Sequence, residues 1–376
     1  IGYETQNIDI KKLKKTYQII MNMEILKLNE EEILGISKNV KKQNSTNDIH
    51  VYSNYHFKAG DIHFDDIIKK IPNLNYAGGT SRNRYFQIRG IGERSQYAGE
   101  GGPIYYVGTV IDDIDVSGIG MAIFLDNVKQ IEVYQGPQSY AYGHNAMAGL
   151  INIHTNDPTE DEYDEFRLTL GNDNLFKASY YKDYEPILNN KLLLNQFIYY
   201  SSQNGFMYNT FLNDYKNNKS EYFQKLKYIY RLNDNLNSKL TIIYSNLNNG
   251  YDAWTPNNNT DTTYSNQPGK DSQELFALSF KNQFLKNKNK LIHIFSILNS
   301  DMEHSYDGDW GNDIFWASEP YNYDPYYYGY YYPNEYSQME LRKRNMSSNE
   351  FRHILNLSNN IIIASGIYYK NLKEID

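Results

Sequence analysis

The sequence predicts a glycine-rich α+β domain followed by the antiparallel strands of a transmembrane β-barrel. Glycines alternate with short apolar runs between residues 60 and 158, which is typical of a compact domain with tight turns. From residue 159 onward, apolar residues recur with period two, as in strands that bury one face. The connections between these strands alternate between short and long, as they do at the two rims of a membrane barrel.

The composition narrows the classes of protein to consider. The 376 residues include 45 acidic and 37 basic ones, for a net charge of −8, and the chain has no long run of Lys and Arg interleaved with aromatic residues. Nucleic acid is therefore not an expected partner. Cysteine is absent, which excludes disulfides and thiolate metal sites. No run approaches the 18 apolar residues of a spanning helix, whereas barrel strands need an apolar residue only at every second position.

The first part of the chain divides into three pieces. Two strand-like runs, "IGYETQNIDI" and "TYQIIMNMEIL", lie within residues 1–29, and a charged linker follows over residues 30–59. In "FDDIIKKIPNL" the apolar spacing predicts a helix from Phe64 to Ile71, which Pro72 ends. A second helix is expected over residues 118–127, "GIGMAIFLDN". The glycines near residue 100 lack the GxGxxG and GK[ST] patterns of phosphate loops.

Residues 159–376 carry the strand pattern. In "EYFQKLKYIYR", Leu226 and Tyr228 fall on one face, and Lys225 and Lys227 fall on the other. We place the apolar face, together with Ile242 of the next run, against lipid. The pattern predicts about nine strands. Turns near residues 189, 234, 287 and 359 are short, and the connections that start near residues 202, 246 and 299 are long.

Three motifs resemble the plug domain of TonB-dependent outer-membrane receptors. They are "FQIRGIG" at 86–92, "VGTVIDDIDVS" at 107–117 and "NVKQIEVYQGPQSYAYGHNAMAGLINIHTNDPT" at 127–159. "GDIHFDDIIKKIPNL" resembles the first helix of that plug. The resemblance implies a structural rather than a chemical motif, made of Arg89, Gly90, Glu132, Gly136, Pro137, Tyr142, Gly143 and Gly149. Its glycines suit a domain that turns its chain sharply with little side-chain bulk.

The resemblance also implies a domain organisation. Residues 1–29 resemble the tail of a carboxypeptidase-regulatory-like domain, residues 30–59 form a linker with a candidate TonB box, residues 60–158 form the plug, and residues 159–376 form the N-terminal part of the barrel. The candidate energy-coupling residues are Glu30, Glu31, Glu32, Ile33 and Leu34, although a solvated linker explains this segment equally well. Plugged barrels of this architecture have roughly 22 strands, so we expect a fragment with an incomplete barrel.

One departure from the family pattern concerns the contact between plug and wall. Relatives carry arginine where this chain has Gln135. In relatives that arginine joins the arginine of the "IRG" motif, here Arg89, in a charged contact with the wall. Arg89 is therefore expected to make this contact alone.

The resemblance implies a receptor and active transporter in the bacterial outer membrane. It would import a ligand such as an iron–siderophore complex, with energy from the TonB–ExbB–ExbD complex, and its partners would be outer-membrane lipid and a small extracellular ligand. The alternatives are an importer of oligosaccharide or another nutrient, and a surface carbohydrate-binding β protein that does not transport. The sequence does not specify the ligand.

No enzyme, cofactor or metal site is expected. HExxH, GxSxG and Cys–His pairs are absent, so an extracellular hydrolase would lack a catalytic set. Three aspartates in "YDGDWGND" lack the spacing of a calcium loop, and we favour a solvated acidic loop over a calcium site.

The candidate ligand-binding residues lie in the longest connection. They are Trp310, Trp316 and Tyr328, because aromatic side chains give broad contact area at low entropic cost. Packing at the barrel rim explains the tyrosine-rich tract there about as well.

Overall fold

The computed structural model describes residues 2–3, 23–24, 32–33, 40–41, 48–53, 61–93, 105–120, 123–139, 145–327, 330–331, 335–358 and 361–375. They fall into two compact units, residues 1–46 and 47–376. In the first unit, β1 (Gly2–Tyr3) pairs with β2 (Met23–Glu24), and β3 (Glu32–Ile33) pairs with β4 (Val40–Lys41), both antiparallel. The carboxypeptidase-regulatory-like tail stays a prediction.

The second unit begins with the domain that we call the plug, which comprises the described residues from 48 to 158. Its central sheet has the order β10–β9–β12–β11–β5. The strands are β5 (Asp48–Ser53), β9 (Val107–Ile111), β10 (Ile114–Asp115), β11 (Val128–Gln135) and β12 (Gly149–Thr155). β12 runs parallel to β9, and the other neighbours are antiparallel. The sheet includes β5, which precedes residue 60, the predicted start of the plug. Ile49 and Val51 of β5 are buried in this sheet.

A second layer of the plug shares one core with this sheet. It contains α1 (Phe64–Ile68) and a three-stranded sheet of β6 (Leu74–Tyr76), β7 (Phe86–Ile88) and β8 (Ile91–Gly92). α1 begins at the predicted residue, where His63 and Asp66 form a capping box. It ends at Ile68 instead of Ile71, because the amide of Ile71 bonds back only three residues and the following proline disfavours helical geometry there.

The second expected helix is wrong. Within the described part of residues 118–127 there is no α-helix; the helical residues are in 3-10 conformation, at Gly120 and in η5 (Leu125–Asn127). Gly118 has a φ of +75°, and a Cβ there would lie 2.3 Å from the ring of Tyr105. Phe124 is extended and bridges to His63. The chain therefore turns at Gly118, and the extended Phe124 lies beside the start of α1.

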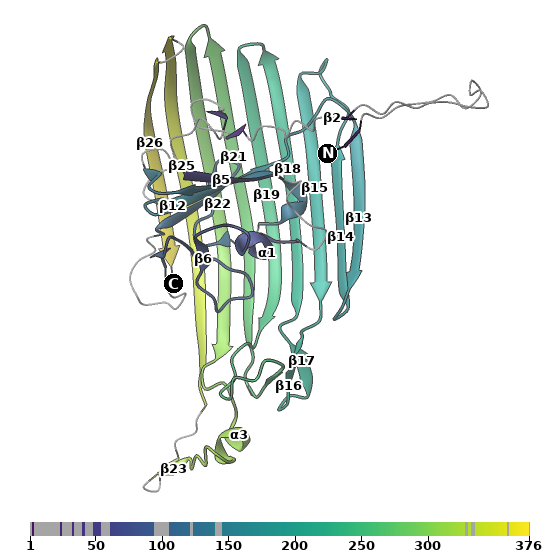
Figure 1. Ribbon diagram of the computed structural model, residues 1–376, viewed down its shortest axis with the longest axis vertical. Helices are drawn as coiled ribbons and strands as arrows, with labels where there is room; N and C mark the ends of the chain where they lie inside the picture. The colour runs from purple at the N-terminus through teal and green to yellow at the C-terminus, as the bar shows by residue number, and fades with distance from the viewer. Residues whose placement is uncertain are drawn as a thin grey trace, which may run out of the picture. The chain divides into compact units, whose positions relative to one another are not determined.

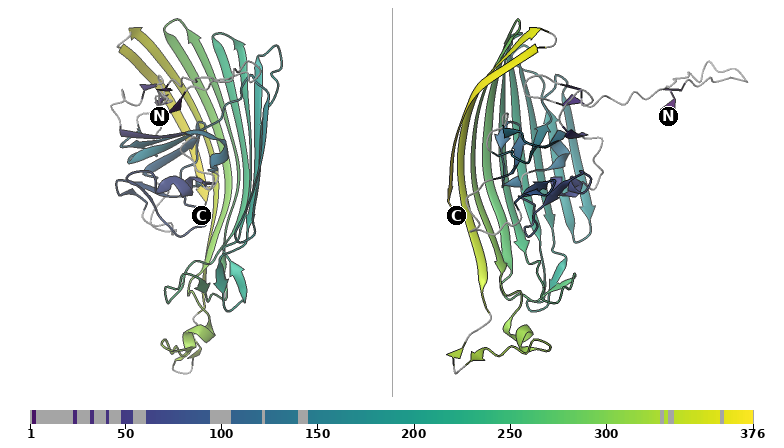
Figure 2. Two further views of the ribbon diagram at one scale, coloured as in Figure 1. Left: turned by 45° about the vertical axis from the view of Figure 1, so that its right-hand side comes forward. Right: turned by 60° about the vertical axis from the view of Figure 1, so that its left-hand side comes forward.

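The rest of the second unit is a nine-stranded antiparallel sheet, which we call the wall (Figure 1). Wall strands that follow one another in the chain pair with each other. Their number, nine, confirms the prediction. The strands are β13 (Tyr163–Gly171), β14 (Leu175–Asp183), β15 (Leu192–Gln203), β18 (Lys219–Asn233), β19 (Leu236–Tyr251), β21 (Gly269–Lys286), β22 (Asn289–Asp307), β25 (Ser337–Ser358) and β26 (Ile361–Ile375). The wall curves, and the plug lies against its concave face (Figure 2).

The two rims of the wall differ as expected. One rim has short connections, at residues 184–191, 234–235, 287–288 and 359–360. The other has a short turn at residues 172–174 and then three long connections. These hold β16 (Met207–Asn209) and β17 (Asp214–Lys216), then β20 (Thr262–Thr263), and finally α3 (Asp313–Ala317), β23 (Tyr326–Tyr327) and β24 (Tyr330–Tyr331). No described helix is long and apolar enough to cross a membrane.

The burial of side chains confirms the predicted register of the wall. Lys225 and Lys227 are fully buried against the plug, whereas Leu226 and Tyr228 lie on the opposite face and are partly exposed. Ile242 also lies on that outer face. Large apolar side chains stay exposed there, among them Phe276, Phe280 and Phe284. An apolar outer face and a polar inner face are what a membrane barrel presents.

Candidate functional site

Arg82 of the plug and Glu221 of the wall form a buried ion pair with two hydrogen bonds. Nε of Arg82 donates to Oε1 of Glu221 and Nη2 donates to Oε2, both at 2.8 Å. The amide of Asn249 on β19 donates to Oε1 of Glu221 (3.0 Å) and to Oγ of Ser81 (2.9 Å). Because a buried charge is costly unless it is paired, this contact fixes the loop between β6 and β7 against the wall.

Asp271 on β21 binds the same loop at a second point. Its Oδ2 accepts hydrogen bonds from N (2.7 Å) and Oγ (2.6 Å) of Ser81, and its Oδ1 pairs with Arg84. On β25, Arg342 donates to the hydroxyl of Tyr85 at 2.7 Å. Strands β18, β19, β21 and β25 therefore all hold this one plug loop.

The turn between β9 and β10 presents carboxylates to lysines of the wall. Asp112 and Asp113 adopt positive φ values of 46° and 70°, which aspartate tolerates better than most residues. Oδ2 of Asp112 lies 3.0 Å from Nζ of Lys227. Both oxygens of Asp113 accept from Nζ of Lys281 at 3.0 Å. Beside them, Nζ of Lys225 donates to Oγ1 of Thr155 at 2.8 Å.

Asp157, in the segment that leads from the plug to the wall, also pairs with lysines of the wall. Its Oδ1 accepts from Nζ of Lys227 (3.1 Å) and of Lys239 (2.7 Å). Burial favours the neutral acid, but Lys227 and Lys239 outweigh it and lower the pKa of Asp157 to about 2. Burial likewise raises the pKa of Asp112, and Lys227 and Lys225 bring it well below its ordinary value. Both carboxylates are therefore ionised at neutral pH.

The last two wall strands hold the plug through a third set of contacts. Oδ2 of Asp115 accepts from Nζ of Lys370 at 2.6 Å. Burial raises the pKa of Asp115, whereas Lys370 and hydrogen bonds from Ser117 lower it, to about 2 overall. Arg344 donates to the carbonyl of Ser117 and to the hydroxyl of Tyr105. This contact places a buried guanidinium over the Tyr105 ring, 5.1 Å from its centroid.

These contacts form two tiers of opposite polarity along β18, β19 and β21. Near the long connections the wall supplies carboxylates, Glu221 and Asp271, to plug arginines. Closer to the short turns it supplies lysines: Lys227, Lys239 and Lys281 pair with plug aspartates, and Lys225 donates to Thr155. An apolar contact joins the tiers, where the rings of Phe124 and Tyr199 lie 4.4 Å apart. The complementary charges define both the height and the orientation of the plug.

Such an interface restrains the plug without locking it permanently. The attraction between buried ions is largely offset by the loss of their hydration, so water that enters the interface can replace these partners. Sequence reasoning placed Lys225 and Lys227 on the face away from lipid but did not find their partners. The available signal was a charged residue at an inward position of a strand, which requires a partner when it is buried.

Glu132, one of the predicted plug-motif residues, is the centre of a buried polar network. Its Oε1 accepts from Nε2 of Gln130 (2.8 Å), and its Oε2 accepts from the hydroxyl of Tyr134 (2.8 Å) and from Nδ2 of Asn152 (3.2 Å). The network lies within β11 and β12 and joins them across their shared face. It serves the internal structure of the plug.

The predicted glycines occupy positions that demand them. A Cβ at Gly149 would lie 2.3 Å from the carbonyl oxygen of Tyr134, so only glycine lets β12 approach β11 there. Gly90 and Gly136 have φ values of +77° and +128°, which favour glycine, and the exposed Pro137 follows the second of them. The other motif residues, Tyr142 and Gly143, lie outside the described residues.

The side chain of Arg89 contacts other residues of the plug. Its Nη2 donates to Oδ2 of Asp48 on β5 (2.6 Å), and its Nε donates to Oε1 of Gln135 (3.2 Å). Nε2 of Gln135 in turn donates to the carbonyl of Pro72 (2.7 Å). Gln135, which stands where relatives carry arginine, thus accepts a hydrogen bond from Arg89 instead of adding a second charge. In the described part of the chain, these two residues join β11 to the plug strands around it.

The three long connections bind one another. β16 pairs with β17 and, in parallel, with β20. The buried Asp252 accepts from Nδ2 of Asn209 (3.0 Å), Oγ1 of Thr263 (2.6 Å) and Oγ of Ser265 (2.6 Å). Nδ2 of Asn312 donates to the carbonyl of Tyr264 at 2.7 Å. The connections therefore form one folded surface at this rim.

The structure describes two of the three predicted ligand-binding residues, and their surroundings differ. Trp310 is exposed, and its ring stacks on that of Trp254 with centroids 5.8 Å apart. Trp316 on α3 is half-buried and packs edge-on against Phe315 and Tyr321. Tyr328 lies outside the described residues. Sequence reasoning did not select Trp254, because 55 intervening residues hide the pairing.

The acidic loop near Trp310 uses its carboxylates to shape the backbone. Oδ1 of Asp307 accepts from the amides of Asp309 and Trp310, both at 3.1 Å, and Oδ1 of Asp309 accepts from the amide of Gly311 at 2.9 Å. The described residues contain no group of three or more His, Cys, Asp or Glu placed to hold a metal ion. Of the candidate coupling residues, Glu32 and Ile33 form β3, and Glu30, Glu31 and Leu34 lie outside the described residues.

Comparison with known proteins identifies the domain against the wall. Residues 41–150 match the family model of the TonB-dependent receptor plug domain. The ferric enterobactin receptor PirA of Pseudomonas aeruginosa is 27% identical over 146 residues, which are 36% of this chain and 20% of the relative. The chain therefore spans about a fifth of this curated relative.

Solved structures show the same fold at low identity. The ferric yersiniabactin uptake receptor FyuA of Yersinia pestis matches with a TM-score of 0.70 and 15% identity, over 87% of this chain and 49% of that one. The ferric-catecholate import receptor Fiu of Escherichia coli K12, in its open form, matches with a TM-score of 0.64 and 13% identity, over 88% and 50%. This chain spans about half the length of these structures.

The comparisons define the class of the plug: residues 41–150 are a TonB-dependent receptor plug domain, and the antiparallel wall beside them has the fold of part of the β-barrel in the solved receptors. The curated relative and the solved structures named above are all described as receptors.

Proposed function

We propose that this receptor imports an iron–siderophore complex across the outer membrane with energy from the TonB–ExbB–ExbD complex. The observation that carries the proposal is the plug on the concave face of the wall, held by complementary ion pairs. Material that passes along this face requires the plug to move or rearrange. The outer membrane has no ATP, so the work must come from the inner-membrane potential, which supplies about 2.3 kcal/mol per charge per 100 mV.

The comparisons support the choice of an iron–siderophore ligand. The curated relative is described as a ferric enterobactin receptor, and the two solved structures as receptors for ferric yersiniabactin and ferric catecholates. The stacked rings of Trp254 and Trp310 at the long-connection rim offer an exposed aromatic surface for such a ligand.

An oligosaccharide is the second candidate ligand. Exposed tyrosines gather in the described part of the last long connection: Tyr321, Tyr326, Tyr330, Tyr331 and Tyr336. Aromatic faces with polar tips suit sugars at a wet rim as well as they suit siderophores.

The decisive experiment measures uptake in cells that carry the receptor and lack other siderophore receptors. Radioactive iron bound to enterobactin or yersiniabactin should accumulate, and collapse of the proton gradient should stop accumulation while surface binding persists. Uptake of labelled oligosaccharide but not of iron would establish the second candidate. Binding of either ligand without energy-dependent uptake would refute transport and favour a surface binding protein.

We further propose that Glu30, Glu31, Glu32, Ile33 and Leu34 belong to the coupling segment. A segment that transmits force makes no contact with ligand, so deletion of residues 29–37 should abolish uptake and leave ligand binding nearly intact. Equal loss of uptake and binding would refute this assignment.

A further inference from the structure

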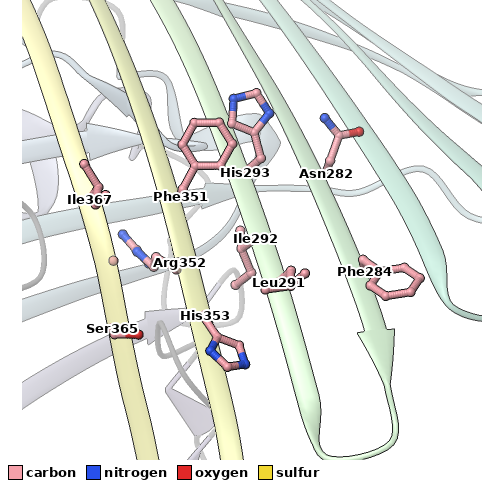
Figure 3. Close-up of a pocket in the computed structure, with 11 residues that line it drawn as sticks. Asn282, Phe284, Leu291, Ile292, His293, Phe351, Arg352, His353, Ser365 and Ile367 are labelled. Atoms are coloured by element: carbon pink, nitrogen blue, oxygen red, sulfur yellow. The ribbon is translucent and has the colours of Figure 1, made fainter.

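A groove of about 530 Å³ lies on the outer face of the wall near its short-turn rim (Figure 3). Its apolar lining comes from Phe284 on β21, Leu291 on β22, Phe351 on β25 and Ile367 on β26. Phe284 stands three residues from Lys281, which contacts the plug, so alternation along the strand points Phe284 the other way. The groove is therefore part of the surface that faces the membrane.

Polar side chains interrupt the apolar band at this groove. On the outer face of β22, His293 lies between Leu291 and Phe295, and its ring stacks on Phe351 with centroids 4.3 Å apart. Asn282 lies beside it on the paired strand. A polar group that faces hydrocarbon is costly and commonly marks a functional position. These side chains offer hydrogen bonds inside an otherwise apolar groove.

A second pair of polar features lies at the rim end of the groove. His353 also lines it, and its Nε2 lies 2.8 Å from Oδ1 of Asn289. Lys286 and Lys288 are exposed at the adjoining turn. Lys286 is two residues beyond Phe284 on the same face of β21, about 7 Å along the strand. Lys288 donates to the carbonyl of Leu357 at 3.0 Å, which directs it toward β25.

We propose that this groove binds an anionic phospholipid of the inner leaflet, with an acyl chain in the groove and the phosphate at Lys286 and Lys288. The short turns of such barrels face the periplasm, so the groove meets the inner leaflet of the outer membrane. His353 lies level with Phe284 and Leu291 at the rim end of the groove, whereas Asn282 and His293 lie two residues farther along the strands from the lysines. An apolar groove beside exposed ammonium groups matches a lipid with an anionic headgroup, and the site is separate from the transport path on the opposite face.

Native mass spectrometry of the purified receptor tests the proposal. Phosphatidylglycerol and phosphatidylethanolamine with identical acyl chains are titrated separately into receptor in mild detergent. We expect phosphatidylglycerol to bind more tightly, by about fivefold for each lysine that contacts the headgroup. The double variant Lys286→Gln with Lys288→Gln should bind both lipids equally. Lys343→Gln, an exposed lysine of β25 far from this rim, should keep the preference.

A second variant tests the groove itself. Ser365 lines the groove, so Ser365→Phe should fill it and lower the retention of both lipids several-fold. Ser347→Phe makes the same change on the outer face of β25, outside the groove, and should not. Heat-dependent mobility in gels verifies that each variant is assembled.

Three results would overturn the proposal. One is equal lipid retention in the Ser365→Phe and Ser347→Phe variants. Another is equal affinity of the unaltered receptor for the two lipids. The third is a receptor dimer that Ser365→Phe dissociates, because the occupant would then be a second copy of this chain.

Discussion

Arg82 and Glu221 lie 139 residues apart in the chain and form a buried ion pair with two 2.8 Å hydrogen bonds. Arg82 belongs to a plug loop and Glu221 to the wall strand β18, so this pair attaches the plug to the wall. Its geometry matches the bidentate fork of arginine and carboxylate, which fixes orientation as well as distance.

Removing one partner of this pair should loosen the plug. Arg82→Ala leaves the carboxylate of Glu221 buried and unpaired, a change that costs about 3–5 kcal/mol. We expect amide hydrogen exchange in residues 81–85 to rise accordingly. Arg82→Met combined with Glu221→Leu should restore most of the protection. As a control, Asp301→Ala removes an exposed pair with Lys343 and should change stability by less than about 1 kcal/mol. Unchanged exchange in Arg82→Ala would show that this pair does not hold the loop.

Acid should release the plug in a narrow pH range. The pKa values of Asp115 and Asp157 are lowered in the folded receptor from 3.8 to about 2. A carboxylate with a lowered pKa stabilises the folded state fully above its unfolded value and loses this contribution as pH falls through the folded value. Protease sensitivity of the plug should therefore stay constant down to about pH 4 and rise between about pH 4 and 2.

A variant checks the origin of the acid sensitivity. Asp115→Asn removes one titrating group beside Lys370. The plug should then be held less tightly at neutral pH, and its protease sensitivity should depend less on pH. If protease sensitivity of the Asp115→Asn plug rose as steeply between about pH 4 and 2 as that of the unaltered plug, groups other than Asp115 would cause the acid release.

The register of the wall predicts opposite outcomes at neighbouring residues. Leu226→Arg puts a charge on the lipid face, at a cost of about 2–4 kcal/mol near the midplane, and should reduce the amount of assembled barrel. Lys227→Met removes the partner of Asp112 and Asp157 and should leave assembly intact while the plug becomes accessible to protease. Gels of membrane fractions measure the first effect. If assembly failed only in Lys227→Met, the register would be shifted by one residue.

The stacked tryptophans should contribute to ligand capture. Alanine at both Trp254 and Trp310 should weaken binding of the transported ligand more than about tenfold, or 1.4 kcal/mol. Trp316→Ala should act through the fold of the connection, because Trp316 packs inside it. Leu188→Ala, exposed at the opposite rim, is the control and should bind normally.

The same prediction depends on the topology of the barrel. Protease added to intact cells should cut within residues 308–336 and spare the turn at residues 234–235. The reverse pattern would invert the topology and remove the basis for ligand capture at this rim.

The sequence by itself determined the strands and their faces. Alternation is a local property, so Leu226 and Lys227 could be assigned to opposite faces before any partner was known. Gly90, Gly136 and Gly149 were likewise found as turn and close-approach positions, although the close contact of Gly149 with Tyr134 is visible only in the folded plug. The prediction of a helix over residues 118–127 was wrong because an apolar run of that length does not distinguish a helix from a buried extended segment.

The tertiary structure alone decided which charges meet. Arg82 and Glu221, Asp113 and Lys281, and Asp115 and Lys370 are separated by 139, 168 and 255 residues, and no local pattern relates them. Each partner is selected by the height at which the plug sits against the curved wall, which depends on all strand registers together. Ion pairing then follows, because a buried charge is stable only beside its counterion. The same reason explains why the stack of Trp254 on Trp310 appeared only once the long connections had folded onto one another.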